Sequence, residues 1–185
     1  MTDPCRPYRQ LARNALLANR RLHEASAALQ PGEWAAVRVS FFPSIEATLN
    51  HILVVGWFYV DALHGGTLGV AAFRDEIPCR NAVELAAAQQ ALDRRLGAFC
   101  DGLTADQLDR EVRIHRADRV QIDTVADTLM HLFLHDQHHR GQVHAMLSGS
   151  SVRPPQLDEF FMGDDRSARV ADLTALGRDE AWVMR

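Results

Sequence analysis

Four long stretches of the chain repeat apolar residues at spacings of three and four, the pattern of amphipathic helices. A Pro-Gly pair follows the first stretch and a Gly-Gly pair follows the second, as expected where helices end. The second stretch is apolar nearly all round, so we expect its helix to be buried on several sides. The pattern predicts helices over about residues 8–29, 43–63, 81–102 and 123–149.

Between the third and fourth helices the apolar period changes from helical to alternating. Val112 and Ile114, then Val120 and Ile122, alternate with polar residues on either side of a polar turn. This alternation predicts a small β-hairpin before the fourth helix. Two prolines follow the fourth helix, and we expect a short tail helix over about 167–176.

Four amphipathic helices with short or moderate connections predict an all-α four-helix bundle. The connection over 64–80 is long enough to let the second and third helices run parallel. We expect a single domain over residues 1–185, with a core at about 8–162 and a tail at 163–185.

Composition and charge exclude several classes of protein. The 185 residues are 47% hydrophobic and 24% charged, the balance of an ordinary globular protein. The net charge is −4, and the 20 basic residues, all arginine, form no block, which argues against nonspecific binding of nucleic acid. The longest apolar run, over 52–60, is far shorter than the roughly 20 residues of a membrane span.

The cysteines and the N-terminus predict a cytoplasmic protein. Cys5, Cys79 and Cys100 are odd in number and widely spaced, so they suit neither a disulfide framework nor a metal knuckle. The first residues, Met1-Thr2-Asp3-Pro4, lack the pattern of a signal peptide. A reducing compartment is the simplest expectation.

The candidate chemistry lies in the histidines, of which there are nine. At about 100° per residue, His139 falls on the inward apolar stripe of the fourth helix and His135 falls beside it. His131 and His138 fall further round, and His144 points away. A spacing of four residues stacks His135 and His139 on one face, so both imidazoles can reach one ion.

A third histidine, His51, interrupts the apolar second helix near its middle. Metal sites in helical bundles usually draw ligands from more than one helix, so we predict a divalent metal ion held by His51, His135 and His139. Three imidazoles leave a coordination position open, as in catalytic zinc sites, and such a site would also fit hydrolysis by a metal-bound hydroxide. Zinc suits nitrogen donors, and nickel, iron and manganese are alternatives. The competing interpretation is a purely structural bundle whose histidines lie on a solvated face or bond to carbonyl groups.

These residues carry a resemblance to a known family. The run 131–142, His-Leu-Phe-Leu-His-Asp-Gln-His-His-Arg-Gly-Gln, resembles the HxxxHRGQ signature of the DinB/YfiT-like proteins. Residues 41–51 resemble the family's second-helix motif, 18–22 resemble its first helix, and 155–158 resemble the segment after its fourth helix. The resemblance covers about residues 8–162.

The resemblance implies a bundle of up-down-down-up order that is often dimeric. It also implies a divalent metal held by three histidines, which in this chain are His51, His135 and His139. Relatives of this kind include S-transferases that use low-molecular-weight thiols and a thiol-dependent maleylpyruvate isomerase.

Two positions depart from the family pattern. Gly56 stands where many relatives carry an acid, and Asp136 stands where relatives often have an amide or glycine. Asp136 either orients a ligand histidine or pairs with Arg140 one turn on, and we expect the pairing with Arg140. Gln142 either hydrogen-bonds a ligand or packs between helices, and Asn50 is expected to be structural.

We therefore expect a metal-dependent enzyme that activates a low-molecular-weight thiol for S-transfer or isomerisation. Its partners would be the thiol, an electrophile and a second copy of the chain, with no nucleic acid or membrane involved. No protein nucleophile is required, and none of the cysteines falls near the histidine motif. The alternative function is that of a non-catalytic metal-binding protein with a role in stress response or ligand binding.

Overall fold

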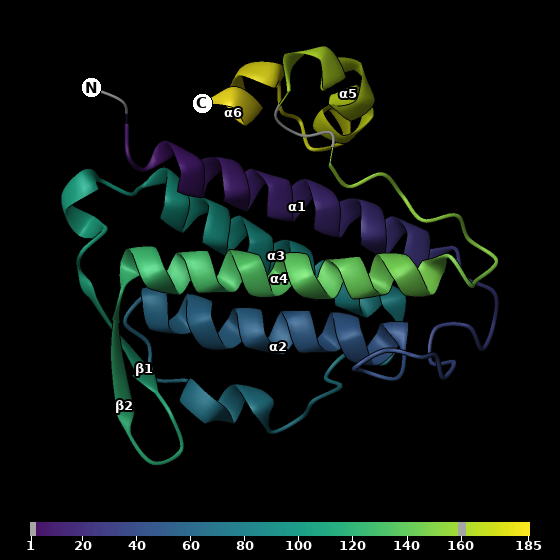
Figure 1. The fold of residues 1–185 in the computed structure, drawn as a ribbon, viewed down its shortest axis with the longest axis horizontal. Coiled ribbons are helices and arrows are strands. Elements are labelled where there is room, and N and C mark those ends of the chain that lie inside the picture. The colour runs from purple at the N-terminus through teal and green to yellow at the C-terminus, as the bar shows by residue number, and fades with distance from the viewer. Residues whose placement is uncertain (1–2, 159–161) are drawn as a thin grey trace.

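The computed structural model describes residues 3–158 and 162–185 and confirms the four-helix bundle (Figure 1). Helices α1 and α4 run in one direction and α2 and α3 in the other, which is the up-down-down-up order. Met1 and Thr2, on which the expected absence of a signal peptide partly depends, lie outside the described residues. The four bundle helices are α1 (Arg6–Ala27), α2 (Ile45–Leu63), α3 (Ala82–Asp101) and α4 (Val125–Leu147).

Polar side chains mark the beginnings of three of these helices. Ser44, Asn81 and Thr124 each accept a hydrogen bond from a backbone N–H three residues ahead, at the N-termini of α2, α3 and α4. Such caps satisfy N–H groups that have no partner within a helix. The connection from α2 to α3 contains the short 3-10 helix η1 (Gly69–Phe73) and allows these two helices to run parallel.

The expected structural role of Asn50 is confirmed, because its side chain holds that connection against α2. Its side-chain amide donates to the Cys79 carbonyl at 2.9 Å, and its carbonyl oxygen accepts from the Cys79 N–H at 3.0 Å. Both bonds are buried, and a buried backbone N–H or carbonyl without a partner would be costly.

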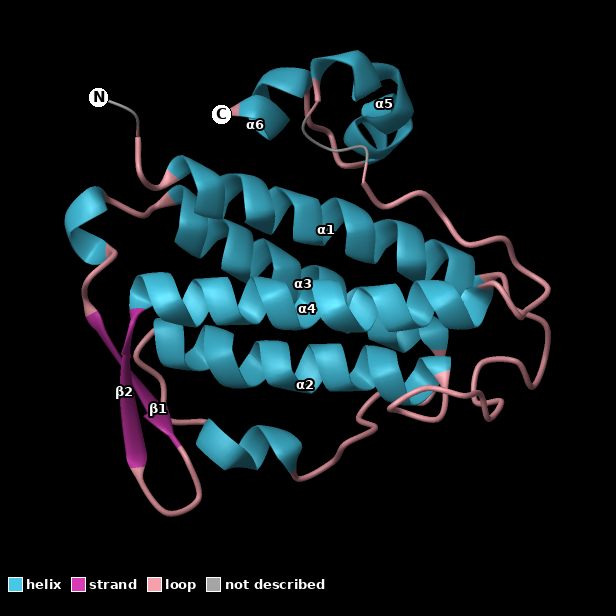
Figure 2. Cartoon of the chain, viewed as in Figure 1, coloured by secondary structure: helices cyan, strands magenta, loops and turns pink. Residues whose placement is uncertain are grey.

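The predicted hairpin is present at one end of the bundle (Figure 2). After the 3-10 helix η2 (Ala105–Gln107), strand β1 (Glu111–His115) pairs antiparallel with β2 (Val120–Thr124). Val112 and Ile114 are buried, whereas Val120 and Ile122 on β2 are exposed. One face of β1 therefore packs on the bundle, and the alternating pattern of β2 faces solvent.

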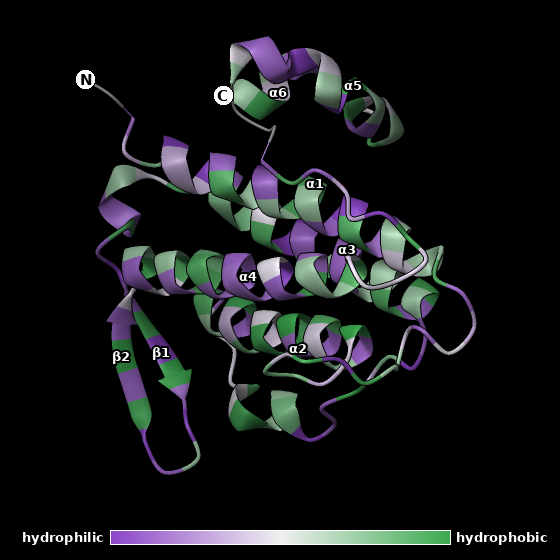
Figure 3. Ribbon diagram, turned by 45° about the vertical axis from the view of Figure 1, so that its right-hand side comes forward, coloured by the Kyte–Doolittle hydropathy of each residue, from purple (hydrophilic) through white to green (hydrophobic). Residues whose placement is uncertain are grey.

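The core lies between the four helices, and α2 is its most buried member. Figure 3 shows hydrophobic residues, in green, recurring along both α2 and α4. Ile52, Leu53 and Val54 of α2 are each at most 1% exposed, as expected for a helix that is apolar on nearly every side. No helix among the described residues combines the length and hydrophobicity that crossing a bilayer requires.

The chain ends in a small helical tail that lies across α1 (Figure 1). It consists of η3 (Gly163–Asp165), α5 (Arg166–Ala175) and α6 (Glu180–Met184). Helix α5 corresponds to the predicted tail helix. Helix α6 was not predicted, because five residues are too few to display a helical period.

Candidate metal centre

The structure brings His51, His135 and His139 together between α2 and α4. One nitrogen of each ring lies within 4.8 Å of the corresponding nitrogens of the other two. The Nε2 atoms of His51 and His135 are 3.0 Å apart. Two nitrogen ligands of one tetrahedral zinc ion lie about 3.3 Å apart, given Zn–N bonds of roughly 2.0–2.1 Å. The ring positions therefore fit a shared divalent ion.

Helix geometry explains how two of the three rings are placed. His135 and His139 are one turn apart on α4, and their ring centroids are 4.4 Å apart. His51 reaches them from the facing helix, with centroid distances of 5.0 and 4.7 Å. His139 is buried, while His51 and His135 are only partly buried, so one side of the cluster is accessible from solvent.

The other histidines of α4 take different roles, as the helical-wheel prediction indicated. The ring of His131 packs edge-on against Tyr59, with centroids 5.1 Å apart. The Nε2 atom of His138 lies 3.1 Å from the side-chain nitrogen of Gln142. Neither His131 nor His138 belongs to the group of converging ligand atoms.

Gln142 hydrogen-bonds a ligand histidine, which is the first of the two roles that the sequence left open for it. The Nδ1 atom of His139 lies 2.8 Å from Oε1 of Gln142. Because an amide oxygen can only accept, Nδ1 of His139 donates, and its Nε2 carries the lone pair that a metal needs. Partners of this kind fix the ring orientation of metal-bound histidines.

Phe42 is a site residue that sequence reasoning did not single out. It lies just before α2, and its ring centroid is 4.3 Å from that of His51 and 5.5 Å from that of His139. The ring covers one side of the cluster with apolar surface. Its place in the Phe-Phe-Pro-Ser segment next to the second helix was the available signal.

The surroundings of His51 and His139 favour the neutral form of these two rings. Burial, together with the neighbouring His139 and His135, lowers the pKa of His51 to about 4. Burial likewise lowers the pKa of His139. Neutral imidazole is the form that binds metal ions, so His51 and His139 are ready for a cation near neutral pH.

The expected pairing of Asp136 with Arg140 is wrong. Among the described residues, Asp136 approaches a ligand instead, with Oδ1 at 3.4 Å from Nδ1 of His135. The buried guanidinium of Arg140 donates to Gln137 at 3.0 Å and extends toward Asn14 and Asn19 of α1. The tertiary position of α1 supplies oxygen atoms that the local helix pattern could not reveal.

Comparisons with known proteins agree with this architecture. A model of the DinB family matches residues 1–167. The chain belongs to the DinB family. A crystal structure of a DinB-like protein from Bacillus subtilis, YjoA, is similar to it at a TM-score of 0.55 with 17% sequence identity, over 79% of this chain and 96% of that chain. A comparison with curated proteins found no match.

Gly56, one of the two positions that depart from the expected family pattern, faces α3. A Cβ atom at this position would come within 2.4 Å of the side chain of Leu92 on α3. The position therefore serves the close packing of α2 against α3. An acidic side chain there would point at the neighbouring helix and not at the metal centre.

Proposed function

We propose that this DinB-family protein is a divalent-metal enzyme that activates a low-molecular-weight thiol for S-transfer or isomerisation. The observation that carries the proposal is the convergence of three imidazoles, two of them partly accessible, with no fourth protein ligand among the described residues. Three protein ligands and an open position are typical of catalytic rather than structural zinc sites.

A surface hollow next to Gln142, the partner of His139, suits a small substrate. It has a volume of about 520 Å³ and lies between the segment before α2 and the last turns of α4. Gln142, which orients His139, lines this hollow together with Arg38, Phe41 and Met146. Its apolar walls and one cation suit a small molecule that carries a negative charge.

The cysteines of the chain are poorly suited to act as nucleophiles. All three cysteines are buried and free. Burial raises the pKa of Cys5 and of Cys79, and raises that of Cys100 to about 12. Since the thiolate is the reactive form, a reactive sulfur would come from a co-substrate.

Each residue of the candidate site has its own role in this proposal. A divalent ion, when bound, would supply a lower thiol pKa and a fixed position for the sulfur atom. His51, His135 and His139 would hold it, Gln142 keeps His139 in the binding tautomer, and Phe42 excludes water from one side. Three points stay predictions: that the native metal is zinc, that the protein is a homodimer, and that it is cytoplasmic.

Elemental analysis of the untagged protein tests the metal. We expect one divalent ion per chain, lost in His51→Ala and in His139→Ala. His144→Ala is the matched control, because His144 lies on α4 outside the cluster. Absence of metal from the wild-type protein after incubation with zinc, nickel, iron or manganese would favour the structural interpretation of the histidines.

Thiol consumption with a model electrophile such as 1-chloro-2,4-dinitrobenzene tests the activity. We expect turnover that requires the metal, disappears in His139→Ala and persists in His144→Ala. Stoichiometric metal without turnover across several thiols would reject the enzyme and favour a non-catalytic metal-binding protein.

A further inference from the structure

A second cavity lies where the tail closes over the groove between α1 and α3. Its volume is about 450 Å³. We propose that this cavity binds a small organic anion with an apolar body, such as an aryl carboxylate or sulfonate. The histidine cluster contributes no residue to it, so the proposal does not depend on the metal centre.

The walls of the cavity carry an excess of positive charge. Four arginines line it, namely Arg9, Arg13, Arg94 and Arg178, against two carboxylates; Arg9 is itself paired with Asp3, which leaves the excess to Arg94 and Arg178. The first carboxylate, Asp101, is paired with Arg13 at 2.8 Å. This excess is local, because the whole chain has a net charge of −4.

The second carboxylate, Asp93, does not neutralise the cavity. Its oxygens accept hydrogen bonds from the side-chain amides of Asn19 and Gln89, at 2.8–3.1 Å. Burial raises the pKa of Asp93 to about 7, so its negative charge is weakened near neutral pH. Among the described residues neither Arg94 nor Arg178 forms an ion pair with it or with any other carboxylate.

A buried donor at the cavity also lacks a partner. Arg13 is 6% exposed, and its two terminal nitrogens donate to Asp101 and to the backbone oxygen of Arg185. Its Nε atom is buried and has no hydrogen-bond partner within the part of the chain that the structure describes. Buried donors are normally satisfied, so the unpaired guanidinium nitrogen shows that this wall is short of hydrogen-bond acceptors.

The remaining wall favours an apolar body attached to the charged group. Ala12, Leu16 and Leu176 line the cavity beside the indole of Trp182. The guanidinium carbons of Arg13 and Arg178 lie 5.3 and 5.4 Å from the centre of this indole ring, distances that hold cations against aromatic rings. Charged and apolar groups in a cavity of this size are typical of small-molecule sites.

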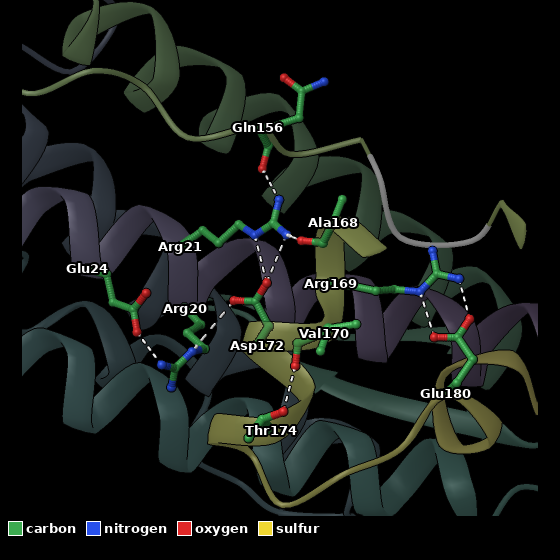
Figure 4. Close-up of polar contacts among 10 residues, drawn as sticks. All are labelled: Arg20, Arg21, Glu24, Gln156, Ala168, Arg169, Val170, Asp172, Thr174 and Glu180. Carbon is green, nitrogen blue, oxygen red and sulfur yellow. Dashed lines mark hydrogen bonds and ion pairs between the residues drawn. The ribbon is translucent and has the colours of Figure 1, made fainter. Parts of the chain in front are cut away.

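The tail completes the cavity and is firmly attached to α1. Figure 4 shows Arg21 reaching Asp172 and the backbone oxygens of Gln156 and Ala168, at 2.6–2.9 Å. The fully buried Arg169 pairs with Glu180 in the same view. These contacts position the last part of the chain.

Leu176, Arg178 and Trp182 all follow residue 167, where the match to the DinB family model ends. The cavity is therefore lined both by α1 and α3 within the matched region and by tail residues beyond it.

Nuclear magnetic resonance of the full-length ¹⁵N-labelled protein tests the site, with naphthalene-2-sulfonate as the probe. The three tryptophans give three indole N–H signals, and Trp182→Phe assigns the one of interest. We expect a saturable shift of the Trp182 signal, with the signals of Trp34 and Trp57 unchanged. Neutral naphthalene-2-sulfonamide should bind about tenfold more weakly, because charge-assisted hydrogen bonds are the stronger ones.

Two variants test whether the cavity arginines recognise the anion. Arg178→Gln and Arg94→Gln should each weaken the probe about tenfold. Both side chains are exposed, so folding should be preserved, which circular dichroism checks. Arg113→Gln, an exposed arginine of β1 outside the cavity, is the control and should bind as the wild type does.

A linear, unsaturated shift of the Trp182 signal would overturn the proposal, as would equal affinity in both cavity variants and the wild type. The same titration with metal-free and metal-loaded protein should give the same affinity. Failure of the thiol reaction would leave this result untouched.

Discussion

Removal of the hydrogen-bond acceptor behind His139 should weaken metal binding without abolishing it. Gln142→Leu keeps a side chain of similar size and deletes the oxygen that lies 2.8 Å from Nδ1 of His139. Without this acceptor the ring is free to rotate and to adopt the tautomer whose Nε2 carries a proton. That tautomer presents no lone pair to a metal ion.

The size of the effect follows from the nature of the bond. A hydrogen bond of this kind contributes about 0.5–1.5 kcal/mol to stability, and loss of the partner of a metal-bound histidine typically costs about 10–100-fold in affinity. Because Gln142 is a neutral acceptor, we expect the lower end, about tenfold or 1.4 kcal/mol. Gln142→Glu retains an acceptor and should bind the metal at least as tightly as the wild type.

Competition for zinc with a chromophoric chelator near neutral pH measures this affinity. Gln142 also contacts Nε2 of His138, at 3.1 Å. His138→Ala removes that contact and keeps the bond to His139, so it should bind zinc as the wild type does. Equal affinity for Gln142→Leu and the wild type would refute the orienting role, as would an equal loss in His138→Ala.

Three further predictions concern stability. Burial lowers the pKa of His23 from 6.5 to about 4, so the stability that folding gains from neutral His23 is complete above pH 6.5 and is lost as the pH falls toward 4. Urea unfolding of His23→Gln at several pH values should lack this loss of about 3 kcal/mol, and parallel plots of unfolding free energy against pH for the variant and the wild type would contradict the prediction. Gly141→Ala, whose new Cβ would meet open space, should raise the melting temperature by about 2–4 °C, whereas Gly56→Ala, whose Cβ would come within 2.4 Å of a side chain, should lower it. A higher melting temperature for Gly56→Ala than for Gly141→Ala would refute the packing argument. Glu180→Gln should weaken the ion pair with Arg169, so limited proteolysis should cleave the tail faster while the bundle remains intact. An unchanged rate of cleavage would show that this ion pair does not hold the tail in place.

Periodicity in the sequence was enough to predict the bundle helices, because a helix displays its buried face at fixed local spacings. Ala15, Ala18 and Leu22 follow one another at spacings of three and four in the first predicted helix, and all three are buried in α1. The hairpin followed from alternation in the same way. Likewise, the spacing of His135 and His139 placed both rings on one face before any tertiary information was available.

Contacts between distant segments had to come from the folded structure. His51 and His135 are 84 residues apart, and their 3.0 Å approach depends on how α2 packs against α4. The partners of Arg140 on α1, the cover that Phe42 provides and the tail cavity around Trp182 depend on packing in the same way. A local pattern shows which face of a helix is buried, but the identity of the neighbour across that face depends on the whole chain.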